Sequence, residues 1–375
     1  MRPSWVLLFL FFPVVTLADD SNYEFGGHTK LRIIGQSYPD DSLFRDLVGS
    51  SSLDAAGELR LNFSAKREQW AFFADYQLLA LHSEFLPAGL PSDNQRLFDL
   101  TKILNDSDEN AIAHRLDRFW VGYTGEKTVV RFGRQALSWG NGLFFSPMDL
   151  VNPFDPTTID TEYKTGDDML YLQYLRDSGD DWQAAVVFRR DLLSGDVDSD
   201  QSTVALKYHG FAGEYEYDLL LADSYGETVV GFGGARSVGG AIWRGDVVVT
   251  DSSADTVVEV ATNLSYSWVW SDKNVSGAVE YYYDGVDSSY VAGSLMIEMS
   301  PLWMMTPTLV GNVDDQSALL QLVTQYSLSD NMTFLGSLNI PLGANGTEFG
   351  GPESGVPNRY LSFDLAVFAQ LAWYF

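Results

Sequence analysis

The last fifteen residues alternate strictly between two faces of an extended chain, and this period-two pattern constrains the fold more than any other feature. One face carries Leu361, Phe363, Leu365, Val367, Ala369, Leu371, Trp373 and Phe375, while the other is more polar. Strands of soluble sheets average about five or six residues, whereas a tilted strand needs about nine to eleven to cross a bilayer. The pattern therefore predicts a membrane-spanning strand with one face toward lipid and the other toward water.

The same alternation recurs along the chain and divides it into strands of similar length, separated by polar turns. We expect strands at 23–36, 54–66, 69–81, 113–124, 127–136, 167–176, 181–190, 201–209, 213–222, 226–234, 239–249, 256–270, 274–284, 289–299, 302–311, 316–326, 331–341 and 359–375. An even number of strands places both termini at one end of a barrel. The sequence thus predicts an all-β fold, a transmembrane antiparallel up-and-down β-barrel of about eighteen strands, with about sixteen as the alternative.

The first eighteen residues have the layout of a secretory signal peptide. Arg2 precedes an apolar run from Val6 to Val15, and small residues lie before Asp19. We expect cleavage after Ala18, so that residues 19–375 form a single barrel domain in the bacterial outer membrane. The longest connections, at about 82–112 and 137–166, then lie on the extracellular side.

Composition excludes several classes of protein. The formal charge of −28 repels nucleic-acid backbones, and the absence of Cys excludes disulfide scaffolds, thiolate metal sites and cysteine nucleophiles. Aromatic residues make up 14% of the chain, and many lie near the expected periplasmic strand ends. These are Tyr23, Trp70, Tyr123, Trp182, Trp268, Trp270, Trp303, Trp373 and Phe375. This placement favours the aromatic girdle of a membrane barrel over the scattered core of a soluble one.

The polar faces of the expected strands would line the lumen. Their cations lie in the first two-thirds of the chain, and carboxylates predominate afterwards. The candidate pore-lining residues are Lys30, Arg32, Arg60, Arg118, Arg131, Arg189, Lys207, Arg244, Glu259 and Glu280. Because strand order is spatial order around a barrel, this pattern predicts a basic arc opposite an acidic arc. The alternative is that these charges pair with one another inside a plugged barrel.

The long connection after Trp139 is unusually apolar for a loop. It is rich in Gly, Pro, Asn and Asp, which predicts tight turns. Its apolar side chains need cover, and the barrel interior is the nearest. We therefore expect a constriction loop, with Trp139, Phe144, Phe145, Asp149, Asn152 and Asp155 as candidate residues, in which Asp149 and Asp155 pair with Arg118 and Arg131. An outward loop packed on its neighbours is the alternative.

Residues 131–156 read RFGRQALSWGNGLFFSPMDLVNPFDP. This stretch resembles the Gly-Arg-Gln and Ser-Trp-Gly signature of Gram-negative outer-membrane porin-like proteins, a group similar in layout to the alginate-export channels. The resemblance implies passive transport of polar or anionic solutes guided by luminal arginines. It would place Arg131, Arg134, Gln135 and Trp139 at or near the constriction, and it adds Gln135 to the pore-lining candidates. Strict alternation, however, puts Arg134 on the face of Phe132, so that it either turns inward at a bulge or lies above the lipid.

Two other classes of function compete with a channel. A hydrolase would need one of four histidines beside a nucleophile, and none lies in a nucleophile motif, although His28, His114 and His209 fall on expected luminal faces. A closed or sheath-type barrel could instead scaffold a partner in export or electron transfer. The short periplasmic turns favour the channel.

The expected partners follow from the barrel. They are outer-membrane lipid and lipopolysaccharide, the barrel-assembly machinery acting through Phe375, and small polar solutes, with no nucleic acid and no cofactor. No metal site is expected from residue spacing. The acidic loops, such as 105–110, are solvated surfaces or alternatively bind Ca²⁺ or Mg²⁺.

Overall fold

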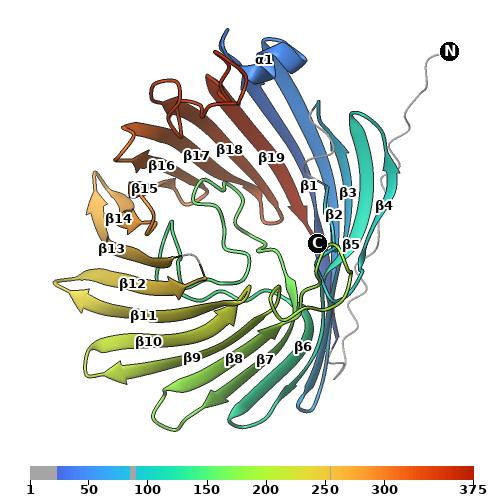
Figure 1. Ribbon diagram of the computed structural model, residues 1–375, viewed down its shortest axis with the longest axis vertical. Helices are drawn as coiled ribbons and strands as arrows, with labels where there is room; N and C mark the ends of the chain where they lie inside the picture. The colour runs from blue at the N-terminus through green and yellow to red at the C-terminus, as the bar shows by residue number, and fades with distance from the viewer. Residues whose placement is uncertain (1–22, 85–89, 254) are drawn as a thin grey trace.

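The alternating segments form one antiparallel sheet that closes on itself, as the computed structural model shows (Figure 1). The structure describes residues 23–84, 90–253 and 255–375, and the expected signal peptide lies outside them. Eighteen strands make the barrel. They are β1 (Tyr23–Ser37), β2 (Ser51–Arg67), β3 (Trp70–His82), β5 (Asn110–Thr124), β6 (Thr128–Gln135), β7 (Asp167–Leu175), β8 (Asp181–Val187), β9 (Thr203–Ala212), β10 (Tyr215–Ser224), β11 (Glu227–Val238), β12 (Ala241–Asp251), β13 (Thr256–Trp270), β14 (Lys273–Tyr283), β15 (Ser289–Ser300), β16 (Trp303–Asn312), β17 (Ser317–Ser329), β18 (Met332–Leu342) and β19 (Leu365–Tyr374).

The barrel closes between its first and last strands. β1 pairs with β19 from His28 opposite Tyr374 to Ser37 opposite Leu365, and with β2 on its other side. Closure satisfies the backbone hydrogen bonds of both edge strands, which an open sheet would leave exposed. The predicted all-β barrel of eighteen strands is confirmed.

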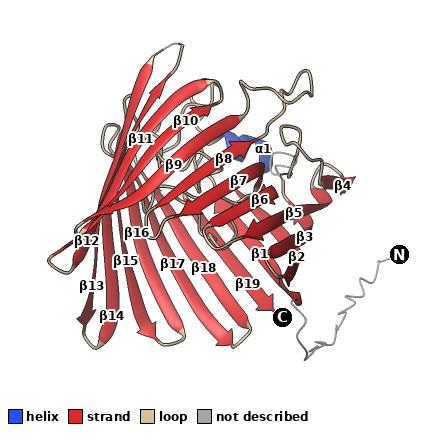
Figure 2. Ribbon diagram, turned by 90° about the horizontal axis from the view of Figure 1, so that it is seen from below, coloured by secondary structure: helices blue, strands red, loops and turns tan. Residues whose placement is uncertain are grey.

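The two ends of the barrel differ in their connections (Figure 2). At the end that carries the start of β1 and the end of β19, most connections are two-residue turns, such as Ser271–Asp272 between β13 and β14. The longest connections, 38–50, 83–109, 136–166, 188–202 and 343–364, lie at the other end, which we call the loop end. We call the end with the short turns the turn end. Aromatic rings gather there, and the ring centroids of Trp70 and Tyr123 lie 5.3 Å apart.

The side chains alternate between an apolar outer surface and a largely polar interior. In β19, Val367 is 41% exposed on the outer face, while Gln370 is 4% exposed on the inner face. In β10, Leu221 faces outward and Asp218 is buried inside. An apolar outer band around a polar interior is the arrangement of a barrel whose surroundings are lipid.

Two elements were not expected from the sequence. Helix α1 (Leu43–Val48) lies in the first loop. Strand β4 (Thr101–Asp106) pairs with residues 111–115 of β5, whereas β6 pairs only with residues 119–124 of β5. The segment that leads to β4, residues 93–100, extends the wall at the loop end. No helix among the described residues is long and apolar enough to cross a membrane.

Most expected strand limits agree with the structure within three residues, and two differ by more. The last strand begins at Leu365 rather than at 359, because residues 359–364 bind the first loop. The hydroxyl of Ser42, for example, donates to the carbonyl of Ser362 at 2.7 Å. The strand expected at 226–234 continues to Val238.

The expected luminal placement of His114 is wrong. In β5, Arg118 pairs with Asp75 of β3, and Leu116 pairs with the next residue of β3, Tyr76. Asp117 has no partner of its own and is the extra residue of a β-bulge. The bulge reverses the alternation on the loop-end side of Asp117. His114 therefore lies on the outer face, with its ring 5.7 Å from that of Tyr76.

Candidate functional site: the lumen and its inward loop

The connection between β6 and β7, residues 136–166, lies inside the ring of strands, and we call it the inward loop (Figure 1). Its apolar residues pack on the inner wall: Met148 is fully buried and Trp139 is 5% exposed. The indole Nε1 of Trp139 donates to Gln183 of β8 at 2.7 Å. Phe145 stacks on Tyr282 of β14, with ring centroids 4.5 Å apart. The barrel interior thus supplies the cover that these side chains need.

Three successive backbone N–H groups of the inward loop converge on the carboxylate of Glu280 in β14. Those of Leu143 and Phe145 lie 2.6 and 2.7 Å from its oxygens, and that of Phe144 lies 3.1 Å away. The side-chain amide of Asn263 donates a fourth hydrogen bond at 3.1 Å. The buried charge of Glu280 is therefore stabilised by N–H dipoles that themselves carry no formal charge.

Asn141 connects the same part of the loop to three neighbouring strands. Its backbone N–H and its side-chain amide donate to Asp246 of β12 at 2.6 and 2.8 Å. The amide also donates to Asp218 of β10 at 3.2 Å, and the carbonyl of Asn141 accepts from Asn263 of β13 at 2.9 Å. Residues 141–145 are thus fixed to the wall between β10 and β14.

The second half of the inward loop binds the other side of the barrel. Gln321 of β17 donates to the carbonyl of Thr157 at 3.0 Å. Asp160 accepts from Lys30 at 2.7 Å and from Arg32 at 2.9 Å, both in β1. Burial alone would raise the pKa of Asp160, but these two cations hold it below its usual range. The loop therefore spans the lumen from β8 and β14 to β1.

Two further contacts fix the loop where it returns to the wall. The ring of Tyr163 lies 4.0 Å from the guanidinium carbon of Arg60. Lys164 donates to Asp149 at 2.5 Å, so the loop is also tied to itself. Burial raises the pKa of Asp149 and lowers that of Lys164, because both groups have left bulk water.

The wall beside Tyr163 carries a dense network of paired charges. Arg60 is 2% exposed and lies 2.8 Å from Asp117, 3.4 Å from Glu58 and 3.5 Å from Asp75. A cavity of about 170 Å³ opens beside this network. Its charged lining residues are Lys30, Arg32, Arg60 and Arg115 with Glu58, Asp117 and Asp160. Asp75 and Glu162 also pair with Arg60 and Lys30, so the cations beside Tyr163 are paired with carboxylates.

The remaining pore-lining candidates lie on the inner face but are not gathered at one point. Lys207 pairs with Asp218 at 2.9 Å, and Arg189 with Asp167 at 2.9 Å. Arg244 donates to Ser265, Glu259 accepts from Tyr282, and Arg131 lies 5.0 Å from the ring of Trp120. Gln135 is buried near the carbonyl of Met169. The expected separation into a basic and an acidic arc is incomplete, because carboxylates of β2, β3, β5, β7 and β10 pair with the cations.

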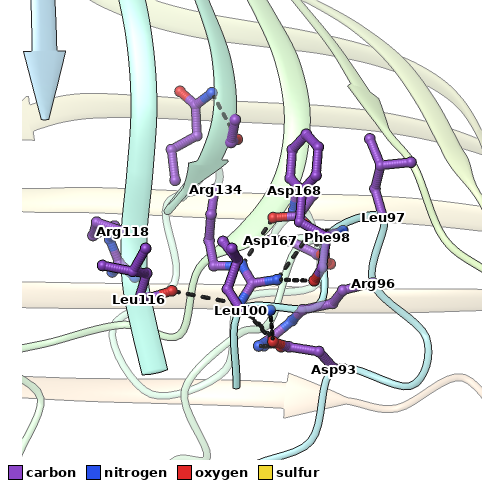
Figure 3. A network of polar contacts seen from close by, with 12 residues as sticks. Asp93, Arg96, Leu97, Phe98, Leu100, Leu116, Arg118, Arg134, Asp167 and Asp168 are labelled. Carbon is purple, nitrogen blue, oxygen red and sulfur yellow. Dashed lines mark hydrogen bonds and ion pairs between the residues drawn. The ribbon is translucent and has the colours of Figure 1, made fainter. Parts of the chain in front are cut away.

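Arg134 enters neither the lumen nor the lipid. The register of β6 is regular, and no bulge turns it inward. Its guanidinium is fully buried within the wall, where it pairs with Asp168 at 2.8 Å and with Asp93 at 3.0 Å (Figure 3). It also donates to the carbonyl of Phe98 at 2.7 Å. Arg134 thus holds the 93–100 segment over the gap that β6 leaves when it ends.

The pairing expected for the two loop aspartates is wrong. Asp149 binds Lys164, while Asp155 accepts from the backbone and hydroxyl of Thr157 in its own turn. Arg118 instead contacts Asp117 and the carbonyl of Lys164. Asn152, also in the loop, has a left-handed backbone with φ of 50° and lies near the loop-end rim.

No family model matches the sequence, and no curated protein matches it. Solved structures match over nearly the whole chain. OccK8 (OprE) of Pseudomonas aeruginosa has a TM-score of 0.57 at 8% identity, and OccAB2 of Acinetobacter baumannii has 0.56 at 10%. A BenF-like porin from Pseudomonas fluorescens Pf-5 has 0.55 at 7%. Each alignment covers 94% of this chain and 98% of the other.

The chain has the barrel fold of an outer-membrane porin. At these identities the likeness is one of fold. The contacts of the inward loop are observed in this chain and are not taken from the similar structures.

Proposed function

We propose that the protein is a bacterial outer-membrane channel for passive diffusion of small polar or anionic solutes, with the inward loop at its narrowest point. The observation that carries this proposal is the binding of one loop to opposite sides of a polar lumen, through Glu280 on one side and Lys30 on the other. The porin fold supports it. The cations that line the cavity beside Tyr163, such as Arg32 and Arg115, support contact with anionic groups of the solute.

The same proposal assigns the surroundings of the barrel. Lipid and lipopolysaccharide contact the apolar outer face, and Phe375 at the end of β19 is presented to the barrel-assembly machinery. The loop end then faces the outside of the cell.

The test is conductance of the purified full chain in planar bilayers, with reversal potentials measured under a KCl gradient. We expect discrete channel steps and a modest preference for anions. Absence of conductance from a protein whose circular dichroism shows intact β-structure would contradict the proposal.

That contrary result would favour the second candidate, a closed or sheath-type scaffold. The observation in its favour is the extent of the inward loop, which contacts β8, β10, β12, β13, β14, β17 and β1. A hydrolase is the lowest candidate, and the observation in its favour is that His28 and His209 lie beside the carboxylates of Glu58 and Asp218.

A further inference from the structure

A second cavity, of about 250 Å³, lies at the loop end and away from the network around Arg60. It is formed where the 93–100 segment, the inward loop and the turn between β10 and β11 meet. Its lining includes Asn94 and Gln95 from the first, Asn152 from the second and Tyr225 from the third. Ser92, Arg96, Asp167, Arg189 and Leu192 complete the lining.

The charged groups of this cavity are already compensated. Arg189 pairs with Asp167 at 2.9 Å, and Arg96 pairs with Asp93 at 2.8 Å. An anionic ligand would have to displace these carboxylates. The cavity therefore favours a ligand without net charge.

The uncharged side chains that line this cavity are of the kinds that recognise hydroxyl groups. Asn94 and Gln95 are exposed, and within the described ranges no hydrogen bond involves their side-chain amides. An amide offers a donor and an acceptor at once, which matches a pair of neighbouring hydroxyl groups. The half-exposed ring of Tyr225 adds an apolar surface with a polar tip.

Tyr225 is also held in an unusual backbone conformation. Its φ is 55° and that of Gly226 is 75°, so both positions of this two-residue turn are left-handed, where Asn-Gly is the favoured pair. Tyr225 is the only aromatic residue among the described non-glycine residues of positive φ. Its N–H donates to the carbonyl of Ser202 at 3.1 Å, and its ring lies 4.6 Å from the guanidinium of Arg189. The fold thus keeps an aromatic ring at this rim against its local preference, which points to a use for the ring.

We propose that this cavity binds a neutral saccharide, with the ring of Tyr225 against the sugar and the amides of Asn94, Gln95 and Asn152 on its hydroxyls. The saccharide has two possible sources, a free oligosaccharide or the polysaccharide chain of lipopolysaccharide. The binding does not depend on whether the barrel conducts.

The test is calorimetric titration of the detergent-solubilised full chain with maltose, with a uronic-acid disaccharide, and with lipopolysaccharide that carries or lacks its O-chain. We expect saturable binding of a neutral saccharide that Tyr225→Ala weakens by about tenfold or more and Tyr225→Phe largely retains. Binding of maltose identifies a free sugar as the source. Binding only of O-chain lipopolysaccharide, with the same dependence on Tyr225, identifies the polysaccharide.

Tyr215, at the far end of β10 from the turn that carries Tyr225, provides a matched control. It is 47% exposed against 50% for Tyr225, and the guanidinium of Arg236 lies 4.5 Å from its ring, but it lies at the turn end. Tyr215→Ala should leave saccharide binding unchanged. The proposal is overturned if no saccharide probe binds, if Tyr225→Ala binds as the natural chain does, or if the uronic-acid disaccharide binds more tightly than maltose.

Discussion

Two regions of the inner wall hold the same loop by different means. The β1–β5 wall uses paired charges, where Lys30 and Arg32 meet Asp160 and each cation has further carboxylate neighbours. On the β12–β14 wall, Glu280 and Asp246 instead accept from backbone and amide N–H groups, beside loop contacts from the amide of Asn263 and the ring of Tyr282. A charged side chain on the β1–β5 wall can exchange one ion-pair partner for another, whereas the N–H groups that bind the β12–β14 wall have fixed positions. We infer that the β12–β14 wall sets the loop's shape and that the β1–β5 wall is its more exchangeable attachment.

The largest effect is expected from Glu280→Ala. The change leaves three loop N–H groups without their acceptor, and each hydrogen bond to a charged group contributes about 1.5–3 kcal/mol. Residues 143–145 should detach, raising single-channel conductance and exposing this part of the loop to limited proteolysis. Glu298→Ala is the control, because Glu298 on the adjacent strand β15 accepts from Asn274 of β14 rather than from the loop. Equal behaviour of the two variants would show that Glu280 does not hold the loop.

A smaller effect is expected from Asp160→Asn. The substitution keeps the shape of the side chain but frees Lys30 and Arg32 from one carboxylate, so anion preference should rise while conductance changes little. Reversal potentials under a salt gradient measure this. Asp155→Asn is the control, because Asp155 bonds only within its own turn and should leave selectivity unaltered. A large rise in conductance with Asp160→Asn would place the shape-setting contact on the β1–β5 wall instead.

The smallest effect is a difference in acid response between the two loop carboxylates. The pKa of Asp149 is raised by burial, so as the pH falls this group protonates above the usual aspartate range and its ion pair with Lys164 is lost first. The pKa of Asp160 is depressed, so the stability it contributes is present above the unfolded value and is lost only as the pH falls through the lower, folded value.

Conductance recorded from neutral to acid pH should therefore change in two steps. Asp149→Asn should remove the step at higher pH and leave the lower one. A single step, or an upper step that survives in Asp149→Asn, would contradict this order.

The sequence predicted the strands well because lipid and water impose a period-two pattern on nearly every strand residue, as in β19. It could not predict the bulge at Asp117, which is a register shift against β3, or strand β4, which depends on where β6 stops pairing with β5. Arg134 shows the same limit: its side chain follows the expected face, but its cover comes from a segment about forty residues away in sequence.

The luminal position of Glu280 followed from alternation, but its partners did not. They are backbone N–H groups, which every non-proline residue has, so no residue type marks them. Asp160 and Tyr163 were missed for a related reason, because a loop without periodicity gives no signal for which side chains meet the wall. The apolar content after Trp139 was the one signal that placed this loop inside.

The central claim is that the inward loop, held between these two walls, forms the narrowest part of a channel. Deleting residues 141–154 tests it most directly, since the strands on either side are left intact. Single-channel recording of the deleted protein should show higher conductance and weaker ion selectivity than the natural chain, because both the steric and the electrostatic barrier are removed. Unchanged conductance and selectivity in a deleted protein that still folds as a barrel would contradict the account.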